Sequence, residues 1–417
     1  MLLSTLLRSG PAAWTALVLI PALCWLSLQN TGSTIATWDS VTAQSTIVLG
    51  FVSAACGACA AWEASRIRTA HVLEWAPARS RLRIATEHLV PTAALGLTGL
   101  AAALAVHAPP ALGGPGLPDP AILATAHLVV LGHMAAGYLL GLKAPRLLAA
   151  AVMLTGGYLW GFWPAALGEA AWLRHLNGQG IGECCSLDRQ PSLRSLGATA
   201  VFSLGLIAAA LAVLLLDRSR KRTASAWALF LACALTAATL AVPLGFDGTQ
   251  PRDASAFRCT GSKPQVCLWP EQQPHRNVFV REATGAAEHL RAVGLQPPAR
   301  IEFGMVKPGP SDIRTVTAAG LLPTEPPACS QGPGAHYPGD AAFAPLYVWL
   351  ALTAGSSPDS LAGRWPQEAI SLAQQVRTLP VPAQRAWYDR NLRALHDCRV
   401  QPEPDPAKAA APGDGAP

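Results

Sequence analysis

The chain has 417 residues, of which 51% are hydrophobic and only 13% are charged, and its formal net charge is +6. A soluble domain usually has about 25% charged residues, so this composition excludes an ordinary soluble protein. Up to Gly245 there are fifteen Lys and Arg against nine Asp and Glu, and beyond it sixteen of each. The basic excess lies in short loops between apolar runs. No patch of the kind that binds nucleic acid is found, and we expect no nucleic-acid partner.

Seven apolar stretches are long enough to cross a bilayer, which needs about 20 apolar residues. None contains Asp, Glu, Lys or Arg, which are costly in hydrocarbon. We interpret the first as an uncleaved span, because no clear small-x-small cleavage site follows it. The predicted spans are Ala12–Leu28, Thr42–Trp62, Leu89–His107, Ala121–Leu142, Leu147–Gly168, Gly197–Leu216 and Trp227–Gly245.

The loops predict the orientation of the spans, because Lys and Arg gather on the cytoplasmic side. With the N-terminus inside, the inner segments hold twelve basic residues and the outer loops hold three, Arg174, Arg189 and Arg194. Seven spans then place residues 246–417 outside. We therefore predict a multi-pass protein of the cell membrane whose C-terminal domain is extracytoplasmic.

The ten cysteines agree with this orientation. Six of them fall in segments predicted to be outside, an even number that suits an oxidising compartment. A Cys259–Cys267 bond would close a short loop, and a Cys329–Cys398 bond would join distant parts of the outer domain. The connectivity stays open. We leave the adjacent Cys184 and Cys185 unpaired or paired elsewhere, because a bond between neighbours is strained.

The most informative inner segment is the loop Glu63–His88. Its apolar residues, together with Arg66 and Arg68, could form a short helix that ends at Pro77. Such a helix could lie on the membrane surface or dock on a cytoplasmic partner. The alternative, which periodicity alone favours, is a solvated basic loop. The apolar residues in question are Ile67, Val72, Leu73 and Trp75.

The outer domain, 246–400, is predicted to be a mostly helical α+β fold, and the tail 401–417 to be disordered because it can bury little apolar surface. The fold class is therefore an all-α polytopic membrane domain, 1–245, followed by this domain. The expected strands are Val266–Trp269 and Arg300–Val306. The expected helices are Asn277–Val293, Ala344–Gly355, Ser360–Leu379 and Pro382–Cys398.

Few residues carry a chemical signature. The sequence has no GxxxxGK[ST], HExxH or GxSxG motif, and we predict no enzyme and no cofactor. Cys56 and Cys59 have redox or metal spacing, but lie in a span where helix packing is the better interpretation. His133, inside the fourth span, is interpreted as a neutral imidazole bonded to a neighbouring helix rather than part of a transport path.

Several weaker patterns remain. Two GxxxG pairs, Gly137–Gly141 and Gly157–Gly161, are candidate helix contact faces. Glu169, Glu183 and Asp188, in the loop that holds Cys184 and Cys185, could shape an outer pocket. The outer histidines could be metal ligands with Glu288 or Asp397, but none has ligand spacing, so no metal site is predicted. These histidines are His275, His289, His336 and His396.

Three stretches together resemble a known group. Ala60–Leu89, in which a Trp ends the second span and an Arg-rich helix follows, resembles exporter-type ABC transporter permeases. The other two resemble the extracytoplasmic domain of actinobacterial membrane proteins labelled permease-like. These are Cys259–Pro270 (CTGSKPQVCLWP) and Gly363–Cys398, which contains Trp365-Pro366 and Arg385-Ala386-Trp387.

The resemblance implies a separate cytoplasmic ATPase subunit that docks on a coupling helix at about Glu63–Pro77. The implied docking residues are Arg66, Arg68, Val72, Leu73 and Trp75. A common exporter permease has six spans, so the seventh span here is a departure. A membrane-anchored extracytoplasmic binding or sensory protein is the alternative, and an enzyme the third hypothesis. A homodimer is left open, and the sequence names no cargo.

Overall fold

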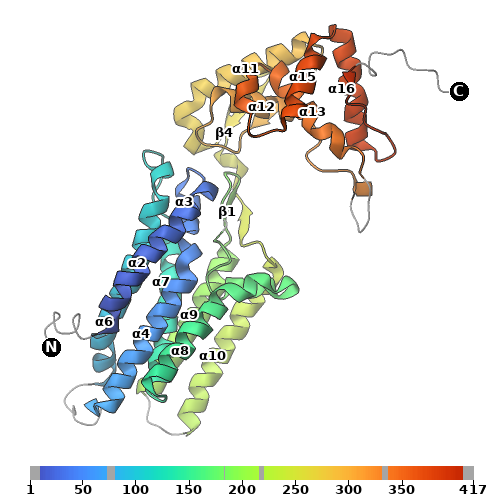
Figure 1. Ribbon diagram of the computed structural model, residues 1–417. Helices are drawn as coiled ribbons and strands as arrows, with labels where there is room; N and C mark the ends of the chain where they lie inside the picture. Colours follow the sequence, from blue (N-terminus) through green and yellow to red (C-terminus); the bar gives the residue numbers. More distant parts are fainter. Residues whose placement is uncertain (1–9, 73–79, 183, 216–219, 331–336, 407–417) are drawn as a thin grey trace. The chain divides into compact units, whose positions relative to one another are not determined.

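The computed structural model describes residues 10–72, 80–182, 184–215, 220–330 and 337–406. The chain divides into two compact units, Met1–Asp253 and Ala254–Pro417 (Figure 1). The predicted boundary at residue 245 therefore moves to Asp253. The reason is that the connector 246–253 carries a short strand that pairs within the first unit.

The first unit is a bundle of apolar helices. Seven helices within the described ranges are long and apolar enough to cross a membrane, as the sequence predicts. They are α2 (Pro11–Gln29), α3 (Trp38–Ser45) continued by α4 (Leu49–Thr69), α6 (Arg81–His107), α7 (Pro120–Gly141), α8 (Arg146–Phe162), α9 (Leu193–Leu215) and α10 (Arg220–Ala241). The chain has the fold of a multi-pass membrane protein.

The second membrane-length helix lies at the centre of the bundle. The run Trp38–Thr69 begins and ends beyond the predicted Thr42–Trp62 span. Within its apolar 18-residue segment 78% is buried, against 11% for the corresponding segment of Thr223–Leu244. Glycines allow α7 to pack closely against this central helix. A Cβ on Gly137 would lie 2.1 Å from the Gly57 carbonyl oxygen, and one on Gly141 would lie 2.1 Å from the Ala61 carbonyl oxygen. The predicted contact face on α7 is therefore confirmed.

Helix α8 packs on another side of α4 through the second glycine pair. A Cβ on Gly157 would approach Ala54 Cα to 2.9 Å, and one on Gly161 would approach Gly50 Cα to 2.8 Å. The central helix is therefore held by backbone-to-backbone approach on two faces. Within it, Cys56 and Cys59 are buried free thiols at helix contacts, as the packing interpretation predicts.

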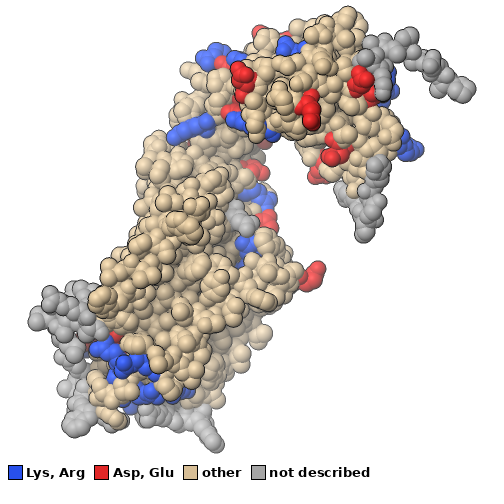
Figure 2. All heavy atoms as spheres, viewed as in Figure 1, with Lys and Arg blue, Asp and Glu red and all other residues tan. Residues whose placement is uncertain are grey.

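Basic side chains gather at one end of the first unit, and the face drawn in Figure 2 has almost no charge over the middle of the bundle. Arg66 and Arg68 lie in the last turn of α4. Arg81 begins α6, and Arg146 begins α8, where its guanidinium lies 5.1 Å from the Trp62 ring centroid. This distribution agrees with the predicted clustering of basic residues on one side of the membrane.

A two-stranded antiparallel sheet lies at the other end of the first unit. Strand β1 (Arg189–Pro191) belongs to the loop between α8 and α9, and β2 (Thr249–Pro251) belongs to the connector after α10. Gln190 pairs with Gln250 at the centre. The connector is thereby tied to the membrane unit over its whole length, since the Arg252 amide also donates to the Asp188 carbonyl.

The second unit is mostly helical with a small sheet, as predicted. Strands β3 (Arg258–Thr260) and β4 (Gln265–Leu268) are antiparallel, and β4 and β5 (Arg300–Glu302) are parallel. Trp349 and Trp387 are fully buried in its main core. Its helices are α11 (Arg276–Ala292), α12 (Pro310–Ala319), α13 (Asp340–Thr353), α14 (Pro358–Leu361), α15 (Gln367–Thr378) and α16 (Val381–His396).

Three predictions for this unit need correction. The expected helix Ser360–Leu379 is two helices, α14 and α15, because Pro366 interrupts it at the N-cap of α15. Helix α12 was not predicted. The start of the tail is ordered rather than disordered, because backbone groups at its Glu403 and Pro404 bond to α16. The Trp387 indole donates to the Pro404 carbonyl, and Asn391 exchanges hydrogen bonds with Glu403.

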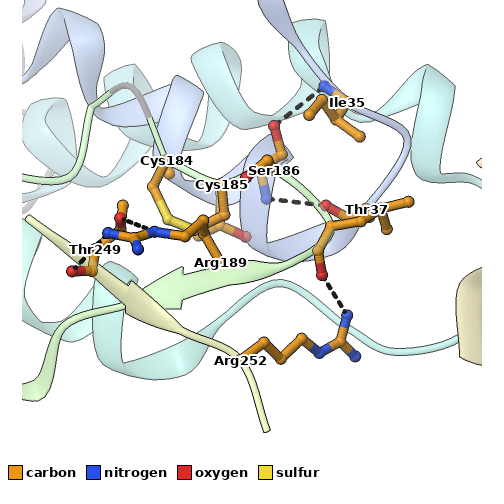
Figure 3. The surroundings of a disulfide bond; sticks show 12 residues. Ile35, Thr37, Cys184, Cys185, Ser186, Arg189, Thr249 and Arg252 are labelled. Carbon is orange, nitrogen blue, oxygen red and sulfur yellow. Dashed lines mark hydrogen bonds between the residues drawn. A yellow bond between two sulfur atoms is a disulfide. The ribbon is translucent and has the colours of Figure 1, made fainter. Parts of the chain in front are cut away.

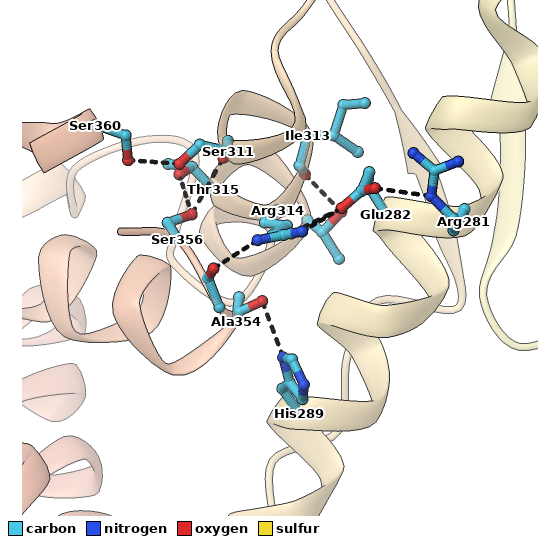
Figure 4. Close-up of polar contacts among 12 residues, drawn as sticks. Arg281, Glu282, His289, Ser311, Ile313, Arg314, Thr315, Ala354, Ser356 and Ser360 are labelled. Atoms are coloured by element: carbon cyan, nitrogen blue, oxygen red, sulfur yellow. Dashed lines mark hydrogen bonds and ion pairs between the residues drawn. The ribbon is translucent and has the colours of Figure 1, made fainter. Parts of the chain in front are cut away.

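Two disulfides join parts of the second unit, Cys259–Cys267 and Cys329–Cys398, and both are the pairings that the sequence favours. A buried carboxylate with two arginine partners joins further elements (Figure 4). Glu282 of α11 accepts from Arg281 at 2.9 Å and from Nη2 of Arg314, on α12, at 2.6 Å. Arg314 also donates to the Gly355 carbonyl at 2.7 Å, so its guanidinium joins α11, α12 and the turn after α13.

Candidate functional site

A polar pocket lies beside the β1–β2 sheet of the first unit. Its volume is about 350 Å³, which falls in the range of about 300–1,000 Å³ typical of small-molecule sites. Three segments that are far apart in the sequence line it, and we call it the sheet-end pocket. Its lining residues are Ser33, Ile35, Ser40, Arg174, Gly180, Cys184, Cys185, Ser186, Arg189, Phe246, Asp247, Gly248 and Thr249.

Arg174 is the most buried charged side chain of the lining, with 5% of its surface exposed. It lies in the last turn of η5 (Gly168–His175), a 3₁₀ segment that follows α8. Its Nε and Nη2 donate to the Gln179 carbonyl at 3.1 and 2.8 Å. Its guanidinium carbon lies 3.9 Å from the ring centroid of Phe246 in the connector. A fixed positive charge therefore forms part of the wall and also holds the connector.

Arg189 supplies a second guanidinium, paired with a carboxylate. It forms an ion pair with Asp247, and its Nε donates to the Thr249 hydroxyl at 2.8 Å. Asp247 also accepts from the backbone and hydroxyl of Thr249 at 2.8 and 2.7 Å. Partial burial acts to raise the pKa of Asp247, but the Thr249 hydrogen bonds and the charge of Arg189 outweigh it and lower the pKa. The carboxylate is therefore ionised at neutral pH.

Cys184 and Cys185 are bonded to each other (Figure 3), which corrects the prediction that they are unpaired or paired elsewhere. Both are 2–3% exposed and pack against apolar residues of the bundle, among them Ala43 and Ile122. No other cysteine belongs to this cluster of described residues. Each of the two cysteines therefore has the other as the thiol close enough to pair with. The two half-cystines give the pocket an apolar part of its wall.

His175 lies behind the pocket and is fully buried. The Gly245 carbonyl, 3.2 Å from Nε2, can only accept, so Nε2 carries the proton and Nδ1 accepts from the Ser195 hydroxyl at 2.9 Å. Burial lowers the pKa of His175. A Cβ on Gly180 would lie 2.1 Å from its Nδ1, so only glycine fits there. The neutral ring joins η5, α9 and Gly245, the residue just before the connector.

The proposed ATPase-docking residues lie elsewhere, at the basic end of the unit. Residues 63–69 are the last two turns of α4, where Arg66 pairs with Glu63 at 2.8 Å. Val72 packs against a buried cluster that includes Ile67 and Tyr138, so its side chain faces the bundle. Leu73 and Trp75 lie outside the described residues. The structure thus places Arg66 and Arg68 in the last turn of α4, and the Val72 side chain shortly after it faces the bundle.

The other candidates are dispersed. Glu169 is exposed in η5, Asp188 contributes its carbonyl to the connector, and Glu183 lies outside the described residues. His133 bonds to the Val129 carbonyl of its own helix at 2.9 Å rather than to a neighbouring helix, which corrects that interpretation. Within the described ranges, no three His, Cys, Asp or Glu side chains group as metal ligands would.

Sequence analysis singled out the cysteine loop of the sheet-end pocket but missed its main polar groups. Arg174 appeared only as one of three outer basic residues, and Asp247 as part of a connector. No motif could have found them, because residues 33–40, 174–189 and 246–249 meet only in three dimensions. The one available signal was the density of Gly and Cys between Gly178 and Cys185.

Comparison with known proteins adds a family match for the second unit. The chain is a multi-pass membrane protein by its helices, and residues 266–398 match the model of a domain of unknown function, DUF7224. The match begins in β4 and ends at Cys398, so it includes three of the four cysteines that form disulfides in this unit. No curated protein and no solved structure matches the chain.

Proposed function

We propose that this protein is a membrane-anchored extracytoplasmic binding protein, which holds a small polar molecule in the sheet-end pocket. The observation that carries the proposal is that the connector itself forms a wall of the pocket. Phe246, Asp247 and Thr249 line it, and they lead directly into the strand that precedes the second unit. A bound molecule would touch the connector, and occupancy would change how firmly the connector is held.

The chemistry of the lining supports a particular class of ligand. An ion pair, a buried guanidinium and serine and threonine hydroxyls offer both donors and acceptors, while Phe246 and the Cys184–Cys185 pair offer apolar contact. This combination fits a small sugar or amino acid, with hydrogen-bonding groups on a compact carbon frame.

A blocking variant tests the proposal. Ser33 lines the pocket and is exposed, so Ser33→Trp fills the pocket without entering the core. We expect some member of a panel of sugars and amino acids to raise the thermal midpoint of the purified full-length protein, and Ser33→Trp to abolish that shift. Gly32→Trp is the matched control, because nothing lies within 4 Å of a Cβ there. No shift with any compound, or equal shifts in both variants, contradicts the proposal.

A second candidate is the permease subunit of an ABC-type transporter that works with a separate cytoplasmic ATPase. The basic end of the first unit favours it, because the partly exposed Arg66 and Arg68 lie in the last turn of α4 and give this helix end a positive charge suited to an acidic partner surface. The expected result is that an ATPase copurifies with the chain from native membranes and is lost in Arg66→Glu/Arg68→Glu. Arg377→Glu, an exposed change in the second unit, should keep it.

A further inference from the structure

An apolar groove runs along one side of the first unit between α6, α7 and α9, and its volume is about 310 Å³. Each helix contributes residues spaced three or four apart, so one face of each forms a wall. Small side chains make the hollow. They are Ala85 and Ala93 of α6, Ala135 of α7 and Ala210 of α9. The groove is thus built into three membrane-length helices rather than left by a loop.

The length of the groove matches one leaflet of a bilayer. Its α6 wall runs from Leu82 to Ala93, which is about 16 Å at 1.5 Å per residue. The hydrocarbon core is about 30 Å thick, so one leaflet is about half of that. Since the groove lies within helices that span hydrocarbon, a lipid chain can fill it, and water would find few polar partners there.

Positive charge lies at one end of the groove. Arg81 is exposed and directly precedes the lining residue Leu82. Lys143 is exposed just beyond the end of α7, whose Tyr138 lines the same end. Basic residues at the membrane surface attract anionic lipid headgroups. We propose that the groove binds one acyl chain of an anionic phospholipid, with the lipid phosphate at Arg81 and Lys143.

This site is independent of the sheet-end pocket and of any transport activity. A specific lipid here would hold α6 to α9, two helices that line opposite sides of the groove. A loosely held boundary lipid would instead contact every exposed apolar side chain equally, including those of Leu97 and Leu154, which lie outside the groove. A second copy of the chain could also fill the groove with one of its helices. These outcomes can be separated by labelling.

The test uses the full-length protein in phosphatidylcholine vesicles that contain a small share of phosphatidylglycerol with a photoreactive acyl chain. We expect the label to concentrate on the groove faces of α6, α7 and α9. Ala93→Phe, which fills the groove, should reduce labelling there severalfold. Ala94→Phe is the matched control, because Ala94 is the next residue of the same helix and points to the exterior.

The headgroup is tested by charge removal and by exchange of the probe. Arg81→Gln should weaken the preference for phosphatidylglycerol about fivefold, as loss of one basic contact predicts, while Arg68→Gln on α4 should leave it unchanged. The same photoreactive chain on phosphatidylcholine should label the groove less. Label spread evenly over the bundle, equal labelling in Ala93→Phe, or a groove that stays unlabelled because a second copy fills it overturns the proposal. The distribution of label on the unmodified chain tests the proposal even if a variant fails to fold.

Discussion

Glu282 is a carboxylate that joins helices α11 and α12 of the second unit. Its side chain is 8% exposed and accepts from Arg281 and Arg314. Removing the charge leaves the Arg314 guanidinium half-buried and without this partner, which costs about 1–3 kcal/mol. We expect Glu282→Gln to lower the thermal midpoint of the full-length protein at pH 7. Glu288→Gln, an exposed change on the same helix, should leave the midpoint unchanged.

The same residue predicts a pH dependence with a definite sign. Burial alone would raise the pKa of Glu282, but the hydrogen bonds and charges of Arg314 and Arg281 outweigh it and lower the pKa. Stabilisation by a carboxylate with a lowered pKa is present above the unfolded value of about 4.3 and is lost as pH falls through the folded value. The gap between wild type and Glu282→Gln should therefore narrow as the pH falls below about 4.3 and close once the pH is below the folded-state pKa. A gap that persists there contradicts the charge argument.

At the scale of helices, the glycines of α7 decide how closely the bundle packs. A Cβ at Gly137 would lie 2.1 Å from the Gly57 carbonyl, whereas one at Gly156 of α8 would meet nothing within 4 Å. Gly137→Ala must therefore push α7 off α4, and we expect a lower thermal midpoint in detergent. Gly156→Ala should hold or raise it, because alanine is favoured in helices by about 1 kcal/mol. Equal midpoints in the two variants would contradict this account of the packing.

The helices were largely predictable from the sequence, and the sheet-end pocket was not. Lipid excludes charge strongly enough that seven uncharged runs located the membrane-length helices, and the GxxxG pairs located two contacts of α4. Helix ends were less certain, since α4 continues through Glu63 to Thr69. The three-residue strands β1 and β2 were invisible because their pairing is set by tertiary contacts and not by alternation.

For the whole molecule, the positions of the disulfides and of the basic residues predict how the chain is oriented in the membrane. The two sides of the membrane differ in redox chemistry and in the charge they favour. All three disulfides lie at the sheet end of the first unit or in the second unit, and an oxidising compartment keeps such bonds. Basic side chains of α4, α6 and α8 lie at the opposite end of the first unit. The proposed sheet-end pocket is accessible to external molecules only in this orientation.

Thiol labelling of intact cells tests that orientation. Glu368 of α15 and Thr69 at the end of α4 are both exposed, so each can carry a new cysteine with little structural cost. A membrane-impermeant maleimide should label Glu368→Cys at once and Thr69→Cys only after the cells are permeabilised. The unmodified chain gives the background, since its four free thiols lie within apolar helices. The reverse pattern would put the second unit and the sheet-end pocket in the cytoplasm, where neither the disulfides nor an extracytoplasmic ligand is expected.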